Sequence, residues 1–173
     1  VLLLCAWWQR GKVTREDLTR ALPFFVVAAA LSVATLWFQH TRAIAGDVVR
    51  TDGFLSRLMF SGWASWFYLA KVLWPAGLCF VYPRVFPDTA QLINWWPLLA
   101  GLCVLAVAYC RRETWGRPLL MAGAVFVLML LPILGFINIY FMKYSLVADH
   151  WQYAAMIAPV ALISLLKASA SSS

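Results

Sequence analysis

Long apolar runs alternate with short polar or basic segments along the chain. An α-helix needs about 20 mostly apolar residues to cross the hydrocarbon core of a bilayer, which is roughly 30 Å thick. The pattern therefore predicts about four full membrane-spanning helices, preceded by a partial span at Val1–Trp8. We place the full spans at Ala21–Gln39, Trp95–Cys110, Pro118–Phe136 and Trp151–Leu166.

The polar segments predict the connections between these helices. In Gln9–Arg20, Thr14 stands three residues before Asp17, a spacing typical of a helix-starting capping box with Asp in place of Glu. The segment His40–Phe60 is amphipathic, so one face can lie in the membrane interface while its arginines stay near water. Further loops are predicted at Pro83–Ile93, Arg111–Arg117 and Ile137–His150.

Residues 61–82 are apolar but irregular, because they contain Lys71 and a Trp74-Pro75 break. One interpretation is a re-entrant helix that enters the membrane, breaks at Pro75 and returns to the same side, with protein or water covering the exposed backbone. The other interpretation is a plain membrane-spanning helix. Labelling a cysteine placed at position 84 from each side of the membrane distinguishes the two.

The composition supports an all-α, polytopic transmembrane bundle. Hydrophobic residues make up 64% of the chain and charged residues 12%, whereas soluble domains have about 45–50% and 25%. We predict one transmembrane helical domain over residues 1–167 and a disordered or placeholder tail at 168–173. Because the chain begins inside an apolar run, we expect it to be a fragment of a longer polypeptide.

The net charge of +7 does not indicate a nucleic-acid partner, because the basic residues lie in short segments between apolar runs. The two most basic are residues 9–20 and 111–117, with four and three Lys or Arg. The positive-inside rule places both on the cytoplasmic side. This needs an even number of crossings between them, which favours the re-entrant interpretation of residues 61–82. The four cysteines have no metal-ligand spacing, so no metal site is expected.

The densest group of polar and aromatic residues lies around the start of the last predicted span. An Asp-His pair at the mouth of a span is costly to hold in lipid and should face a cavity or a partner. Asp149 would act as a base or metal ligand, and His150 would carry a proton. The alternative is structural, with Asp149 capping the last helix. The candidate cavity-lining or substrate-lining residues are Lys143, Tyr144, Asp149, His150 and Tyr153.

Four other basic residues are candidate contacts for the phosphate of a lipid, because guanidinium groups bind phosphate in a bidentate manner. The alternative is that their long side chains extend to lipid headgroups, without a specific ligand. These candidates are Arg42, Arg50, Arg57 and Lys71.

Three stretches of the chain resemble a bacterial family. Its members join a GT-C-type glycosyltransferase-like membrane domain to tetratricopeptide repeats, and they are related to the transmembrane-and-TPR O-mannosyltransferases. The most specific stretch has Val-Ala and an acidic residue before an aromatic-rich helix start. The stretches are Leu18–Phe25 with Trp37–His40, Trp66–Pro75 with Tyr82–Arg84, and Phe141–Tyr153. They correspond to the C-terminal part of the family's membrane domain.

The resemblance implies a multi-pass protein of the bacterial cytoplasmic (inner) membrane that uses a polyprenyl-phosphate-linked sugar on the extracytoplasmic side. The family's catalytic acid lies in an upstream loop outside this chain, so no catalytic residue is expected here. Asp149 and His150 match the family motif and are expected to line a cavity. No cofactor is implied beyond the lipid-linked sugar donor.

Two functions compete at this point. The chain is either a fragment of such a glycosyltransferase or a non-catalytic structural subunit packed in a larger bacterial membrane complex, for example a photosynthetic or respiratory one. A fold alone does not decide between them. In both cases membrane lipids are partners, and the second requires other membrane protein subunits. A transporter is a third interpretation, based on the breaks at Pro75 and Pro132.

Overall fold

The computed structural model describes residues 1–44, 49–84 and 88–171. Every regular element in these ranges is helical, which confirms the all-α prediction for the described chain. The α-helices are α1 (Leu2–Arg10), α2 (Arg15–Phe38), α3 (Phe54–Leu73), α4 (Trp96–Cys110), α5 (Gly116–Leu130) and α6 (Ile157–Ser171). The short 3-10 or π segments are η1 (Gln39–Ile44), η2 (Leu92–Trp95), η3 (Leu131–Ile133), η4 (Tyr140–Lys143) and η5 (Asp149–Gln152).

A short turn joins α1 to α2. Gly11 ends α1 in the left-handed conformation with φ 72°, which glycine adopts without steric cost. Thr14 then begins α2, because its Oγ1 accepts from the amide of Asp17 at 3.4 Å and the Asp17 carboxylate accepts from the amide of Thr14 at 2.9 Å. The predicted capping box is confirmed. It places the start of the helix at Arg15, before the predicted start of the span at Ala21.

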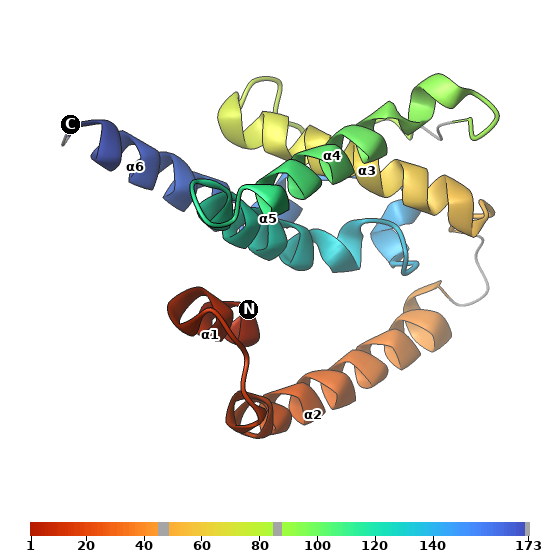
Figure 1. The fold of residues 1–173 in the computed structure, drawn as a ribbon. Coiled ribbons are helices and arrows are strands. Elements are labelled where there is room, and N and C mark those ends of the chain that lie inside the picture. The colour runs from red at the N-terminus through yellow and green to blue at the C-terminus, as the bar shows by residue number, and fades with distance from the viewer. Residues whose placement is uncertain (45–48, 85–87, 172–173) are drawn as a thin grey trace.

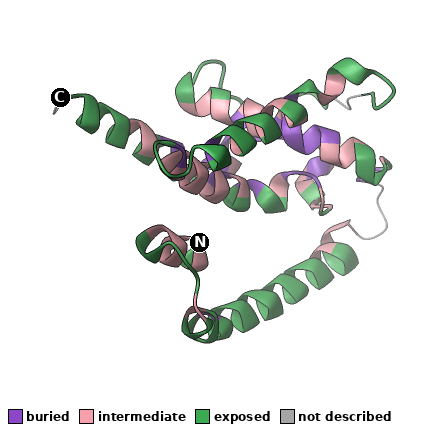
Figure 2. Cartoon of the chain, viewed as in Figure 1, coloured by how far each residue is buried: buried purple, intermediate pink, exposed green. Residues whose placement is uncertain are grey.

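Helix α2 lies apart from the other long helices and is attached to the fold at its two ends (Figure 1). It contacts α1 at its beginning, and it continues into η1, which contacts η4. Ala21 is the one buried residue among its 24, and its other residues are mostly exposed in Figure 2. A helix that is apolar on every face and bare of protein needs hydrocarbon or partner helices around it.

Helix α3 forms the centre of the fold. It begins at Phe54, so the predicted loop His40–Phe60 ends earlier than expected. Its buried residues cover a whole turn, 59–62, and continue to Ala64 and Tyr68, and the helix contacts α4, α6 and η5. Met59, Phe60, Ala64 and Tyr68 are fully buried.

The chain turns back after α3. The helix ends at Leu73, next to the predicted Trp74-Pro75 break, and residues 74–84 form no helix. We call residues 77–84 the return segment, because they run back toward the beginning of α3. Its last described residue, Arg84, donates from Nη2 to the carbonyl of Val49 at 2.7 Å. Both ends of the 49–84 stretch therefore meet, and the re-entrant and membrane-spanning interpretations of residues 61–82 both stay predictions. The number of spans stays a prediction.

Among the described residues, three helical stretches are long and apolar enough to cross a membrane. They are Arg15–Ile44, Leu92–Cys110 and Gly116–Ile133. The last predicted span is shorter than expected, because α6 begins at Ile157 and not at Trp151. It also includes residues 168–171, for which the sequence predicts a disordered tail, while 172 and 173 lie outside the described residues.

Candidate functional site

Asp149 is the centre of a buried polar network. It lies on η5, and its Oδ2 accepts from the amide of Cys79 at 2.6 Å and from the hydroxyl of Tyr82 at 2.8 Å. The residue is 8% exposed. The structural alternative of a cap on the last helix is wrong, because Asp149 bonds to the return segment and α6 begins at Ile157. Asp149 instead holds the return segment against the residues that precede α6.

Two acceptor oxygens on η5 have no partner in the described chain. They are Oδ1 of Asp149 and Oε1 of Gln152, and both are buried. Residues three apart eclipse each other on a 3-10 helix, so the two side chains share a face. A buried acceptor without a donor costs about 1–3 kcal/mol. This face of η5 is therefore suited to a hydroxyl-bearing or water-like donor, which no sequence motif indicated.

Lys71 joins the same network through Tyr82. Its ammonium group donates to the carbonyls of Ala76 and Gly77 at 2.6 and 3.1 Å, and it lies 5.4 Å from the ring centre of Tyr82. The sequence predicted Lys71 and Asp149 as separate candidates. The structure brings them together, and Lys71 stabilises the turn that follows α3 by bonding its free carbonyls.

Ser145 adds a bond to the return segment, and Tyr68 joins α3 to the residue before η5. The amide of Tyr82 donates to Ser145 Oγ at 2.9 Å, and the amide of Ala148 donates to the Tyr68 hydroxyl at 3.2 Å. Sequence reasoning missed Tyr68, Tyr82 and Ser145, because nothing in their local pattern distinguishes them from other interfacial residues.

The other residues of the predicted cluster point to different places. His150 stacks on Phe80 with ring centres 4.7 Å apart. The Tyr144 hydroxyl bonds with that of Tyr140, and Tyr153 is 66% exposed. Lys143 receives a hydrogen bond from Arg84 on its carbonyl. Asp149 and His150 thus both contact the return segment, whereas Tyr144 and Tyr153 are exposed on the surface.

The three arginine candidates also differ from one another. Arg50 is buried and bonds to Asp52 from Nε at 2.7 Å and from Nη2, and its guanidinium lies 5.0 Å from the ring centre of Phe60. A side chain on Gly135, whose φ is 90°, would collide with Arg50. Arg57 donates from Nη1 to the carbonyl of Gly135 at 3.0 Å, whereas Arg42 is exposed on η1. Arg50 and Arg57 thus stabilise loops through hydrogen bonds within the protein.

The pKa of Asp52 reflects this pairing. Burial acts to raise the pKa of its carboxyl group, but the hydrogen bonds and charge of Arg50 outweigh burial and lower the pKa below its ordinary value. The Arg50–Asp52 pair therefore favours the ionised carboxylate.

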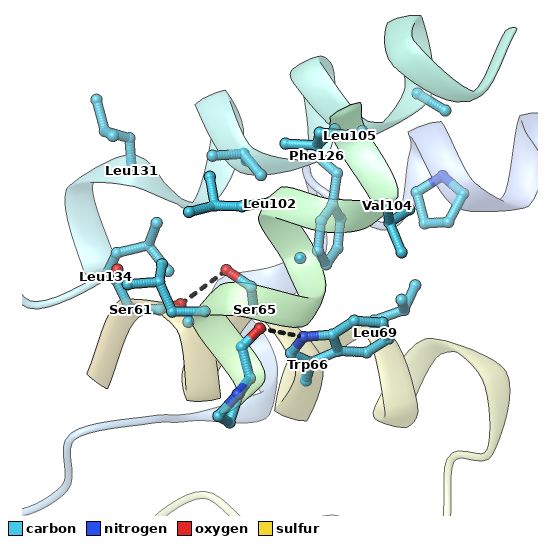
Figure 3. Close-up of a pocket in the computed structure, with 18 of the residues that line it drawn as sticks. Ser61, Ser65, Trp66, Leu69, Leu102, Val104, Leu105, Phe126, Leu131 and Leu134 are labelled. Atoms are coloured by element: carbon cyan, nitrogen blue, oxygen red, sulfur yellow. Dashed lines mark hydrogen bonds between the residues drawn. The ribbon is translucent and has the colours of Figure 1, made fainter. Parts of the chain in front are cut away.

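An apolar groove of about 390 Å³ lies between α3, α4 and α5, with α6 at one side. Figure 3 shows Ser65 and Trp66 on one wall and Leu102, Leu105 and Phe126 on the others. The polar groups of the wall are bonded within the protein. Trp66 donates from Nε1 to the carbonyl of Pro97 at 2.8 Å, and Ser65 donates from Oγ to the carbonyl of Ser61 at 2.8 Å.

The groove does not include the predicted cluster. None of Lys143, Tyr144, Asp149, His150 and Tyr153 lines it. Its far end reaches Leu134 and Phe136, and Arg57 donates to the carbonyl of Phe136 at 3.4 Å. Arg57 is therefore a predicted phosphate contact that is hydrogen-bonded to a residue of the groove wall.

In the part of the chain that the structure describes, no three His, Cys, Asp or Glu side chains form a group able to hold a metal ion. Comparisons with protein-family models, with curated proteins and with solved structures find no match. The functional argument therefore depends on the geometry of the chain and on its resemblance in sequence.

Proposed function

We propose that the chain is the C-terminal part of a GT-C-like integral membrane glycosyltransferase domain, and that it holds the hydrocarbon chain of a polyprenyl-phosphate-linked sugar in the groove between α3, α4 and α5. The observation that carries this proposal is that the polar side chains of the groove walls already have hydrogen-bond partners within the protein. Because the Trp66 indole and the Ser65 hydroxyl already donate to protein carbonyls, the walls offer an occupant mainly apolar contacts.

The size of the groove supports an organic occupant. Its volume of about 390 Å³ lies within the roughly 300–1,000 Å³ of ordinary ligand sites. An isoprenoid chain has no donors or acceptors, so it matches such walls without leaving a polar group unpaired.

Arg57 marks the end where the phosphate would lie. A guanidinium group has five N–H donors, and Arg57 uses Nε and Nη1 to bond carbonyls and Asn138. In the described chain its Nη2 has no protein partner, so that donor is directed to a ligand in this proposal. The catalytic acid lies outside this chain, and Asp149 positions the return segment.

The orientation follows from the same arrangement. Arg57 bonds to residues after the end of α5, whereas the basic segment 111–117 includes its beginning. The phosphate end of the groove and this basic segment are thus at opposite ends of α5. With the basic segments in the cytoplasm, as the positive-inside rule favours, the phosphate end lies on the extracytoplasmic side.

Photo-crosslinking tests the proposal. The chain is placed in nanodiscs with a polyprenyl phosphate that carries a photoreactive group in its isoprenoid chain, and the adducts are mapped by mass spectrometry. We expect adducts on groove residues of α4 and α5. Ser65→Leu fills the groove and should abolish them, whereas Ala29→Leu on the exposed face of α2 is the matched control. Adducts spread equally over α2 and the bundle would refute the proposal.

The exposure of α2 favours the second candidate function, a structural subunit of a larger membrane complex. One buried residue among 24 leaves most of this helix free for a partner. A photoreactive amino acid at Val33 tests this in native membranes. Adducts with one defined protein would support the subunit function, and adducts with lipid alone would exclude a protein partner at this face.

A further inference from the structure

The two most basic segments of the sequence meet at one end of the fold, although about 100 residues separate them. Arg117, at the beginning of α5, donates from Nη2 to the carbonyls of Trp7 and Trp8, the first at 3.2 Å. Its guanidinium also lies 5.5 and 5.4 Å from the ring centres of these tryptophans. The Trp7 carbonyl also accepts from the amide of Gly11 at 2.8 Å, so Arg117 adds a second donor to the last turn of α1. Arg117 thereby attaches the end of α1, directly before the polar part of residues 9–20, to the beginning of α5.

The charges at this end do not cancel. Residues 9–20 and 111–117 together hold seven Lys or Arg and three Asp or Glu, a net charge of +4. Three of the arginines face carboxylates, namely Arg10 with Asp17, Arg20 with Glu16, and Arg112 with Glu113. Arg117 is bonded to the carbonyls of α1.

Three cations are left over. Lys12, Arg15 and Arg111 are exposed, and within the described residues their side chains have no hydrogen bond or ion pair. We call these three residues the basic triad. Long cationic side chains that are exposed and uncommitted are suited to phosphate groups outside the protein.

The position of the triad at the ends of apolar helices indicates that the phosphate belongs to a lipid headgroup. Arg15 begins the apolar stretch Arg15–Ile44, and Arg111 directly follows the apolar stretch Leu92–Cys110. The ends of such helices lie at the depth of lipid headgroups, where tryptophans such as the exposed Trp115 are also enriched. We propose that the basic triad binds the headgroups of anionic phospholipids at this end of the fold.

The net positive charge of residues 9–20 and 111–117 favours anionic over zwitterionic lipid. The ammonium group of phosphatidylcholine offsets its phosphate, whereas phosphatidylglycerol keeps a net negative charge. Each basic residue near an anionic surface raises the binding constant by about fivefold. Arg117 is a positioning residue in this site, because it holds the two segments together but bonds to α1 itself.

Native mass spectrometry tests the proposal. The chain is reconstituted in nanodiscs with equal parts of phosphatidylglycerol and phosphatidylcholine, and the lipids that stay bound after release are identified. We expect selective retention of phosphatidylglycerol. Arg111→Gln should weaken that retention about fivefold, and Lys12→Gln should act similarly. The matched control is Arg111→Lys, which keeps the positive charge at the same exposed position and should keep the retention.

Each outcome decides the proposal. Equal retention of the two lipids, or equal weakening in Arg111→Gln and Arg111→Lys, would overturn it. Circular dichroism confirms that each variant is folded, and Lys12→Gln replaces Arg111→Gln if the latter is not. Arg117→Leu adds a further readout: it should reduce lipid selectivity although Arg117 is not a member of the triad. Higher salt should weaken retention in the native chain, because the charges are exposed.

Discussion

Gly62 on α3 lies in close contact with Leu98 on α4, and enlarging it should separate the two helices. A Cβ built on Gly62 lies 2.7 Å from the backbone and Cβ of Leu98. Carbon atoms in good contact are about 3.5–4.0 Å apart. In Gly62→Ala the helices must therefore move apart by roughly 1 Å. Small residues at a contact between membrane helices allow this close approach.

The energetic cost can be worked from the same contact. Forcing an extra carbon into a packed site costs about 1–3 kcal/mol. A shift of this size also stretches the bond from Trp66 Nε1 to the carbonyl of Pro97, now 2.8 Å, beyond hydrogen-bonding distance. Alanine in a helix gains about 0.5–1 kcal/mol over glycine. We expect Gly62→Ala to lower the free energy of unfolding by about 1–2 kcal/mol.

Gly101 provides the matched control on the facing helix. A Cβ there meets only the Trp66 Nε1 atom, at 3.9 Å, which is an ordinary contact. Gly101→Ala should therefore be neutral or stabilising by up to about 1 kcal/mol. Both variants are measured by reversible unfolding in bicelles. Equal stability of Gly62→Ala and the native chain, or equal loss in both variants, would refute the inferred close packing.

Three further predictions concern local contacts. Thr14→Ala removes the capping box of α2 and should cost about 1 kcal/mol of stability in the same unfolding assay. The Arg50 pair lowers the pKa of Asp52, so its stabilisation is present above the usual aspartate pKa of about 3.9 and lost as the pH falls toward the folded pKa. Asp52→Asn should abolish that loss in melting curves recorded against pH. Tyr82→Phe removes one hydrogen bond to Asp149 and should speed hydrogen exchange of the return segment, consistent with a loss of about 1 kcal/mol.

The sequence predicts the helical fold well where local signals are strong. The apolar runs indicate the all-α fold, and the Thr14–Asp17 spacing correctly identifies the start of a helix. The break at Trp74-Pro75 correctly marks the end of α3. These features depend on neighbours within a few residues, which the sequence displays directly.

Long-range contacts explain the predictions that differ from the structure. The sequence predicts that the last span begins at Trp151, but a short 3-10 turn lies there, and its Asp149 accepts from the amide of Cys79, 70 positions earlier in the chain. Likewise, Arg50 was expected near water, but its partner Asp52 and the ring of Phe60 allow its burial. No local pattern reports such partners. The groove is also invisible in sequence, because its walls come from separate helices.

The bond between Arg117 and the end of α1 has a consequence for how the protein is made. Arg117 is synthesised 109 residues after Trp8. A ribosome that adds about 5–20 residues per second takes roughly 5 to 20 seconds to cover that distance. Both α1 and α2 are completed within this interval, before α5 is synthesised. The α1–α2 hairpin is therefore synthesised before its binding site on α5, and its attachment to the bundle is a late event of biogenesis.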